Sequence, residues 1–388
     1  QSRKLGDHKV AAEHFLRVAK VAPNSKIRPT AEYDAAASLI LLKQWATVET
    51  VLEGFRTLYP EHKLLPDITK KLAVVYKEDG KLIKSAKEFE RIEKENPKDD
   101  GLRREALNQA AELYEQANAK DKALLVYLKL VSFFPEPIED AIENRQKVAD
   151  IYFSQGEHKK YIAELNKIVE TDAGGRDGRT DRTRFLAAKA ALVLSKPELD
   201  AFKKVALVKP FKKNLKKKKK RMRTAIDTYT KLVDYQVAEV TAAATYYIAE
   251  IYYEFSVALL GSERPANLND EELEQYELVI EEQAYPFEEK AISVHEKNME
   301  LLDVGIYNEW IDKSIAKLAV LMPARYAKTE QSSTIITMIY PQAKTKNKGN
   351  IIDKSGNDKT DNEVKGNDII SEEVIEQEER YKKVVVGG

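Results

Sequence analysis

The residues that could carry acid–base, nucleophilic or metal chemistry are few and scattered in this chain of 388 residues. There is no cysteine, which excludes disulfides, thiolate metal sites and a cysteine nucleophile. The five histidines form no His-Glu-x-x-His motif and no pair four residues apart. Neither a Gly-x-Ser-x-Gly elbow nor a glycine-rich phosphate loop occurs. We therefore expect no enzyme activity, no metal ion, no cofactor and no small-molecule substrate.

The most distinct polar feature of the sequence is a run of basic residues. Nine of the twelve residues from 212 to 223 are basic: Lys212, Lys213, Lys216, Lys217, Lys218, Lys219, Lys220, Arg221 and Arg223. Nucleic acid or anionic lipid could neutralise this run, although no aromatic residue for base stacking lies between the lysines. Pairing within the chain is an alternative, because residues 270–289 carry nine acidic residues and no basic one. A solvated helix face is the third interpretation.

Composition favours a folded chain without a global electrostatic preference. Hydrophobic residues make up 43% and charged residues 33%, and 64 basic residues balance 64 acidic ones. A net charge of zero predicts neither a nucleic-acid binder nor a membrane-surface protein as a whole. No apolar run approaches the roughly 20 residues that span a bilayer.

A repeat organises the sequence from position 1 to position 173. Helix-closing prolines recur at nearly equal intervals, at Pro23, Pro60, Pro97 and Pro135. Between them a small residue precedes a tyrosine, a turn follows, and a second helix carries an aliphatic or aromatic seam. Residues 71–97 and 109–135 match in this way, and residues 147–173 form a further copy.

This pattern resembles the tetratricopeptide repeat (TPR), a helix pair with a usual period of about 34 residues. The resemblance covers residues 1–173. The copies are slightly longer than usual, and we expect their additional residues to lie in turns. The resemblance implies an all-α solenoid of antiparallel helix pairs. The stretch LGDHKVAAEHFLRVAKVAP (5–23) then corresponds to a second helix, so we expect the first repeat to be truncated, with its first helix and any targeting segment upstream of Gln1.

In TPR proteins the first helix of each pair lines a concave groove that holds a peptide or protein. The register of the repeats places eight residues in this groove: Tyr33, Lys70, Lys77, Asn108, Glu112, Gln146, Asp150 and Phe153. Their mixed charge argues against the carboxylate clamp of a cytosolic chaperone adaptor, which needs regularly placed Asn and basic residues.

Beyond the repeats we expect a Gly/Asp/Arg-rich loop over 174–184 and a C-terminal helical, TPR-like region over 185–328. Helices are predicted over 185–194, from Pro197, and over 211–240, 241–255, 270–283, 286–302 and 309–321. Some rings of the 246–255 aromatic cluster should be exposed, since two adjacent pairs on one helix cannot all face inward. Residues 329–388 should be a largely disordered tail, in which 369–383 alone has the apolar spacing of a short helix.

The C-terminal region is also similar to a bacterial family of envelope TPR proteins. The strings PFKKNLKKKKKRM (210–222), LLGSERP (259–265) and EEQAYPFEEKAISVHE (281–296) carry this resemblance. Members are found with energy transducers of the Tol, TonB and gliding-motility type. The resemblance implies a non-catalytic scaffold, periplasmic or outer-membrane-associated, that binds a protein partner. The alternatives are a cytosolic TPR adaptor of the chaperone co-factor kind and a binder of nucleic acid or an anionic surface through residues 212–223.

Overall fold

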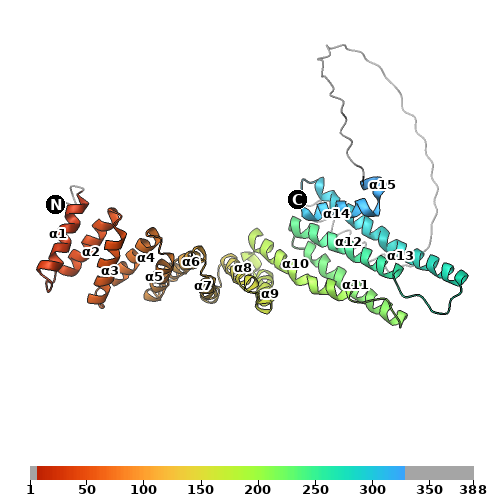
Figure 1. The fold of residues 1–388 in the computed structure, drawn as a ribbon, viewed down its shortest axis with the longest axis horizontal. Helices are drawn as coiled ribbons and strands as arrows, with labels where there is room; N and C mark the ends of the chain where they lie inside the picture. The colour runs from red at the N-terminus through yellow and green to blue at the C-terminus, as the bar shows by residue number, and fades with distance from the viewer. Residues whose placement is uncertain (1–6, 328–388) are drawn as a thin grey trace, which may run out of the picture. The chain divides into compact units, whose positions relative to one another are not determined.

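The computed structural model describes residues 7–327, and this part of the chain is helical without a strand, as predicted (Figure 1). The chain forms two compact units, Gln1–Leu194 and Ser195–Gly388, which we call unit 1 and unit 2. The expected tail, with its segment at 369–383, lies outside the described residues.

Unit 1 is a row of helices in which each packs against the next along the chain. They are α1 (His8–Val21), α2 (Arg28–Leu41), α3 (Trp45–Leu58), α4 (Leu65–Glu78), α5 (Leu82–Glu95), α6 (Asp100–Gln116), α7 (Lys120–Phe133), α8 (Ile138–Ser154) and α9 (His158–Gly174). Turns of three residues join α2 to α3, α4 to α5, α6 to α7 and α8 to α9, so each of these pairs is antiparallel. The TPR-like arrangement of helix pairs is therefore confirmed, with α2, α4, α6 and α8 as first helices. The additional residues lie partly between repeats, as in the turns 22–27 and 59–64, and partly in the first helices α6 and α8, which have 17 residues each against 14 in α2 and α4. The expectation that they lie in turns is therefore wrong for these two later copies.

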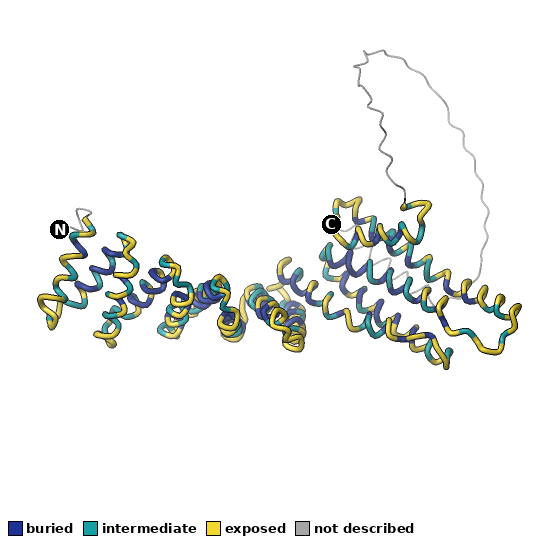
Figure 2. The backbone as a smooth tube through the Cα atoms, viewed as in Figure 1, coloured by how far each residue is buried: buried dark blue, intermediate teal, exposed yellow. Residues whose placement is uncertain are grey.

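Small residues and tyrosines form the core of unit 1 at the places that the repeat predicts. Ala73 and Ala111 are fully buried, which lets neighbouring helices approach closely. Tyr76 and Tyr114 are buried three residues further on. Each buried ring of this size stabilises the fold by about 1.5–3 kcal/mol. Figure 2 shows this buried side along every helix of the row.

Unit 2 contains longer helices. After the last part of α10 (Asp181–Lys203) come α11 (Phe211–Val233), α12 (Ala238–Leu260), α13 (Asp270–Met299), the 3-10 turn η2 (Glu300–Leu302), α14 (Glu309–Leu321) and α15 (Pro323–Tyr326). Helix α12 packs against α11, α13 and α14. It carries the row Ala242, Ala243 and Ala244, all fully buried. Such small residues suit a central helix that several others approach.

Two predicted helix breaks are wrong. Helix α10 runs through Pro197, and α13 runs through Pro286. An interior proline removes one backbone hydrogen bond and costs about 3 kcal/mol, but both prolines are exposed, so their rings meet solvent. Helix α13 is held by its packing on α12. The segment expected as a loop, 174–184, contains the 3-10 turn η1 (Arg176–Gly178) and the first turn of α10.

The expected exposure of aromatic rings on α12 is also wrong. None of Tyr246, Tyr247, Tyr252, Tyr253 and Phe255 is exposed. Several neighbours cover α12 at once. The centroid of the Trp310 ring on α14 lies 5.7 Å from that of Tyr246 and 5.2 Å from that of Tyr247. The Lys317 ammonium lies 3.8 Å from the centre of the Tyr253 ring. Tyr252 and Phe255 are buried, and the other three rings are half-buried.

Candidate protein-interaction surface

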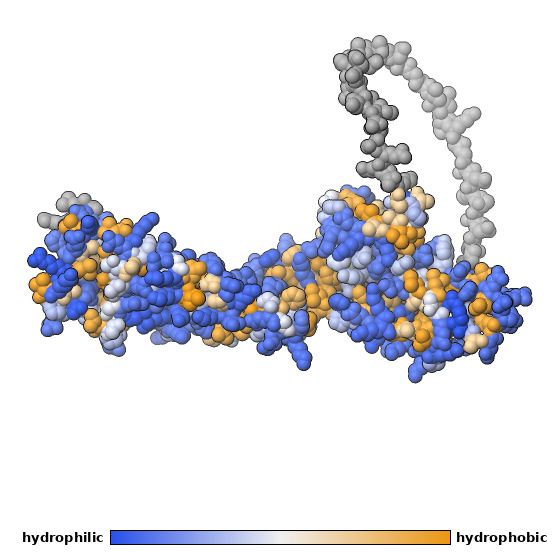
Figure 3. Space-filling model, viewed as in Figure 1, coloured by the Kyte–Doolittle hydropathy of each residue, from blue (hydrophilic) through white to orange (hydrophobic). Residues whose placement is uncertain are grey.

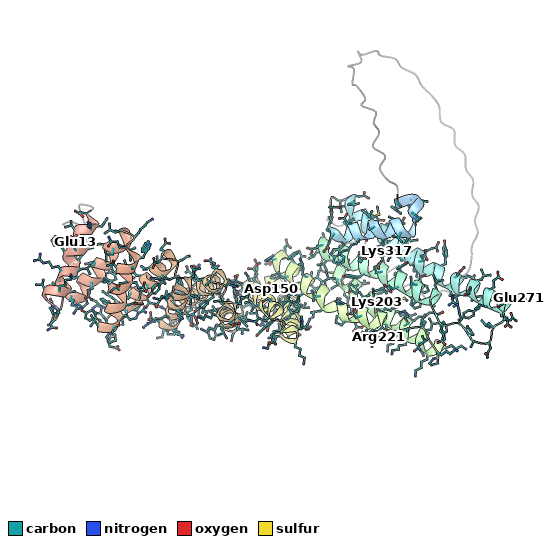
Figure 4. All side chains as sticks on the ribbon, viewed as in Figure 1. Glu13, Asp150, Lys203, Arg221, Glu271 and Lys317 are labelled. Carbon is teal, nitrogen blue, oxygen red and sulfur yellow. The ribbon has the colours of Figure 1, made fainter. Side chains whose placement is uncertain are left out.

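The eight residues predicted for the groove lie on the four first helices of unit 1, and together we call them the first-helix surface. They are Tyr33 on α2, Lys70 and Lys77 on α4, Asn108 and Glu112 on α6, and Gln146, Asp150 and Phe153 on α8. Lys70, Lys77, Glu112, Asp150 and Phe153 are exposed, and the other three are half-buried. Asp150 is labelled in Figure 4.

Polar contacts join each first helix to the next one, and α8 to α10. Tyr33 donates to Asp67, Lys77 Nζ donates to Gln109 Oε1 at 3.5 Å, Lys147 Nζ pairs with Glu115 Oε2 at 3.1 Å, and Arg182 Nε pairs with Glu143 Oε1 at 2.8 Å. The hydrogen bond to Asp67, together with burial, raises the pKa of Tyr33. Exposed ion pairs are each worth about 0–1 kcal/mol. These contacts therefore fix side-chain positions on the surface more than they stabilise the fold.

The charge of this surface changes sign along the chain. Lys70 and Lys77 make α4 basic, whereas Glu112 on α6 and Asp150 on α8 are acidic. Phe153 adds an apolar ring that is 58% exposed and lies 5.0 Å from the Tyr161 ring, between centroids. A ligand that follows these helices meets positive, negative and apolar groups in turn.

Sequence reasoning missed one apolar residue beside these eight. Val74 is 50% exposed on α4. Val74 occupies the position that Glu112 and Asp150 occupy in the next two repeats. The register could therefore have identified it. In Figure 3 the visible face is mostly hydrophilic, with apolar residues in small groups.

The basic run lies on α11 and divides into two parts. Lys218 is only 3% exposed, and its Nζ donates to the carbonyl of Val205 at 2.9 Å and of Phe202 at 3.4 Å. It thus binds carbonyl groups at the end of α10, where a cation is favourable. Burial lowers the pKa of Lys218. It is a structural residue and cannot contact a partner, unlike the other eight basic residues, which are exposed.

The structure does not show the internal pairing of this run with residues 270–289. Helix α12 packs against both α11 and α13. Within residues 7–327 no ion pair joins the two charged segments, and the basic run makes one ion pair, from Arg221 to Glu198 at 3.5 Å. Sequence alone could not reveal that a third helix lies between them.

A Ser-His-Glu cluster in unit 2 resembles catalytic geometry but is enclosed. Ser314 Oγ lies 3.2 Å from His295 Nδ1, and His295 Nε2 lies 3.4 Å from Glu250 Oε1. Ser314 and His295 are fully buried, so no substrate reaches them. Burial alone would raise the pKa of Glu250, but His295 and Lys317 hold it below its usual value. The cluster ties α12, α13 and α14 together.

Between residues 7 and 327 no group of three or more His, Asp or Glu side chains is arranged to hold a metal ion. No helix in that range is long and apolar enough to cross a membrane.

Known proteins offer only distant comparisons. No family model and no curated protein matches this sequence. Among solved structures, a TPR protein from Parabacteroides merdae is 12% identical over 72% of this chain and 94% of its own, with a TM-score of 0.29. A chain of the Naa15/Naa10 complex bound to HypK-THB is 13% identical over 83% of this chain and 52% of its own, with a TM-score of 0.30. Human IFIT1, in a dimer with PPP-AAAA, is 16% identical over 81% of this chain and 59% of its own, with a TM-score of 0.25.

Proposed function

We propose that this protein is a non-catalytic scaffold that binds a protein or peptide along the first-helix surface of unit 1. One observation carries the proposal: equivalent positions of consecutive first helices present charged and apolar side chains, from Lys70 on α4 to Asp150 and Phe153 on α8. Stacked helix pairs supply an extended surface for a partner without any chemistry of their own.

The side chains of this surface indicate what the partner offers. Apolar groups would cover Val74 and Phe153, which are half or more exposed. Acidic groups would lie against Lys70 and Lys77, and basic groups against Glu112 and Asp150. An extended segment with acidic residues at one end and basic residues at the other fits this order, because complementary charges fix its direction.

Site-specific photocrosslinking in the native organism tests this function. A photoreactive amino acid at Lys70, Glu112 or Asp150 should crosslink the full-length protein to one discrete partner. The matched positions Lys87 and Leu125, exposed on the second helices α5 and α7, should give no such product. Equal crosslinking from both sets, or none from the first set, would contradict the proposal.

We also propose that the scaffold works in a bacterial cell envelope, in the periplasm or at the outer membrane, as an assembly factor. The sequence resemblance of residues 185–328 to envelope proteins found with Tol, TonB or gliding-motility transducers supports this role, and the absence of cysteine is compatible with it. The full-length protein should fractionate with the periplasm or outer membrane, and its crosslinked partner should belong to such a machine. Recovery in the cytoplasm would favour the chaperone-adaptor alternative.

A further inference from the structure

The first half of α13 has apolar residues on two opposite sides. Ile280 and Ala284 are buried on the side that packs against α12. Leu278 and Tyr285 are each 60% exposed. Because they are seven residues apart, they lie two turns from each other on one side of the helix. That second side is covered by nothing within residues 7–327.

Carboxylates surround these two exposed residues. The exposed side of α13, which we call the acidic face, comprises Leu278 and Tyr285 with Glu271, Glu274, Glu281, Glu282 and Glu289. In the described part of the chain, only Glu277 among residues 270–289 forms an ion pair, with Arg264 at 3.4 Å. Within that part, the acidic face therefore offers several carboxylates that have no cationic partner.

Helix α11 carries the complementary surface. Its basic face comprises the exposed residues Lys212, Lys213, Lys216, Lys217, Lys219, Lys220, Arg221 and Arg223. At a rise of 1.5 Å per residue, residues 212–223 extend over about 18 Å and residues 271–289 over about 28 Å, so one face fits along the other. Lysine stems can cover Leu278 and Tyr285 while their ammonium groups reach the carboxylates.

These two faces do not pair within one molecule, because α12 packs against both helices and no ion pair joins the faces within residues 7–327. We propose that the basic face of α11 in one molecule docks on the acidic face of α13 in a second copy. Figure 4 labels Arg221 on α11 and Glu271 in the first turn of α13. The surface belongs to unit 2 and is distinct from the first-helix surface.

In a head-to-tail contact each molecule uses its basic face on one neighbour and its acidic face on another, so the contact is heterologous. Each associated pair of molecules keeps one free basic face and one free acidic face, which lets further copies add. Self-association should therefore increase with concentration without stopping at a dimer. Because charges attract across a partly solvated contact, salt should weaken it.

Sedimentation velocity of the full chain at low and high salt tests the association. At low salt the average mass should rise with concentration. Raising the salt should weaken association by about tenfold or more, because several charge pairs are screened together. A wild-type protein that stays monomeric at low salt at every concentration would overturn the proposal, even if it bound anionic vesicles or DNA through α11.

Charge reversal identifies the faces. The basic-face variant carries Lys213→Glu, Lys217→Glu and Lys220→Glu, and the acidic-face variant carries Glu274→Lys, Glu281→Lys and Glu282→Lys. Each variant alone should associate at least about tenfold more weakly than wild type, because reversing three charges cuts the basic face from eight positive charges to a net charge of +2 in one variant and turns the acidic face from five negative charges to a net charge of +1 in the other. An equimolar mixture should associate, because each variant supplies the face that the other lacks. Circular dichroism verifies that both variants fold.

A matched control carries Lys63→Glu, Lys87→Glu and Lys98→Glu, three exposed residues of unit 1. It has the net charge of the basic-face variant and should associate like wild type. A mixture of the two face variants that associates no better than either variant alone, or a face variant that alone associates as strongly as wild type, would overturn the proposal.

Discussion

Tyrosine hydroxyls connect neighbouring repeats at single residues. Tyr114 Oη donates to Glu90 Oε1 at 2.8 Å, and Glu90 Oε2 pairs with Lys129 Nζ at 2.8 Å. Tyr76 donates to Glu53 at 2.5 Å one repeat earlier. The spacing in the sequence predicts the buried tyrosines, but it does not predict the carboxylates that accept hydrogen bonds from their hydroxyl groups. Those partners come from the preceding helix pair, and only the packing angle places them in reach.

Replacing Tyr114 by Phe should lower the free energy of unfolding by about 1.5 kcal/mol or more, because a hydrogen bond to a charged group is lost while the ring remains. Thermal or urea unfolding measures the difference. Tyr152 is the matched control, since it has the same repeat position and makes no comparable hydrogen bond in the described structure. Tyr152→Phe should change stability by less than about 0.5 kcal/mol. Equal effects of the two substitutions would contradict the role of the Glu90 contact.

Glu90 should also make stability depend on pH. Burial alone would raise its pKa, but Lys129 and Tyr114 outweigh burial and lower the pKa of Glu90. A carboxyl group whose pKa is lower in the folded state stabilises the fold above its unfolded pKa, and this contribution is lost as pH falls through the folded pKa. Melting temperatures between about pH 7 and pH 3 should therefore fall less steeply for Glu90→Gln than for wild type. Parallel curves would show that the pair contributes nothing.

Lys218 shows how the register of a helix can contradict composition. Composition places it among nine basic residues, yet it lies four residues before the buried Met222 and seven after Phe211, on the same stripe of α11. The apolar spacing through the lysines therefore predicts an inward position for this one residue. Its carbonyl partners at Phe202 and Val205 belong to the preceding helix and turn. The sequence offers no sign of that contact.

At the scale of the elements, the same turn ends every first helix. The residue at its centre has positive φ in all four repeats: Lys43 (53°), Gly80 (71°), Asn118 (53°) and Gly156 (74°). In the second of these turns Lys81 N donates to Tyr76 O at 2.8 Å and Gly80 N to Lys77 O at 3.1 Å. These two bonds define a Schellman motif, which favours glycine.

Lys43→Gly should stabilise unit 1 by about 1 kcal/mol, because a left-handed conformation costs a residue with a side chain about 1–2 kcal/mol. The reverse change, Gly80→Lys, should destabilise by a similar amount. No atom lies within 4 Å of a Cβ added at Gly80, so the cost would come from the backbone alone. Melting temperatures of the two variants should move in opposite directions. A shift in the same direction would show that other contacts of Lys43 or Gly80 dominate.

Helix ends were predictable where capping residues mark them. Helix α14 was predicted over 309–321 and spans Glu309–Leu321, with Asn308 accepting hydrogen bonds from Trp310 and Ile311 and a proline at position 323. Pro197 and Pro286, in contrast, indicated breaks that do not occur. Whether a helix continues through a proline depends on its neighbours, as α12 supports α13. That information is tertiary and absent from a local pattern.

At the scale of the whole molecule, the regular spacing of the repeats was enough to find the first helices. Lys70, Asn108 and Gln146 occupy the same position in three consecutive repeats and lie on α4, α6 and α8. The pairing of the charged segments was not predictable in this way. Unit 2 has no comparable period, so the sequence does not show which of its helices are neighbours.

The two tryptophans of the chain allow each unit to be followed separately. Trp45 packs against the core of unit 1 around Leu52 and Phe55, and Trp310 packs in unit 2 against Ala242 and Ile311. Each unit therefore has a core of its own that includes one tryptophan. Compact units with separate cores commonly unfold in separate transitions.

Urea unfolding followed by tryptophan fluorescence should therefore show different midpoints in the Trp45→Phe and Trp310→Phe variants, which retain the reporter of unit 2 and of unit 1 respectively. Far-ultraviolet circular dichroism of the wild type should show both transitions, because each unit is helical. The conservative replacements keep an aromatic ring, and the dichroism of each variant serves as the control that its units remain folded and retain wild-type midpoints. Coincident midpoints in all three proteins, with equal slopes of unfolding free energy against urea concentration, would mean that the chain unfolds as one cooperative body. This slope increases with the surface that becomes exposed on unfolding.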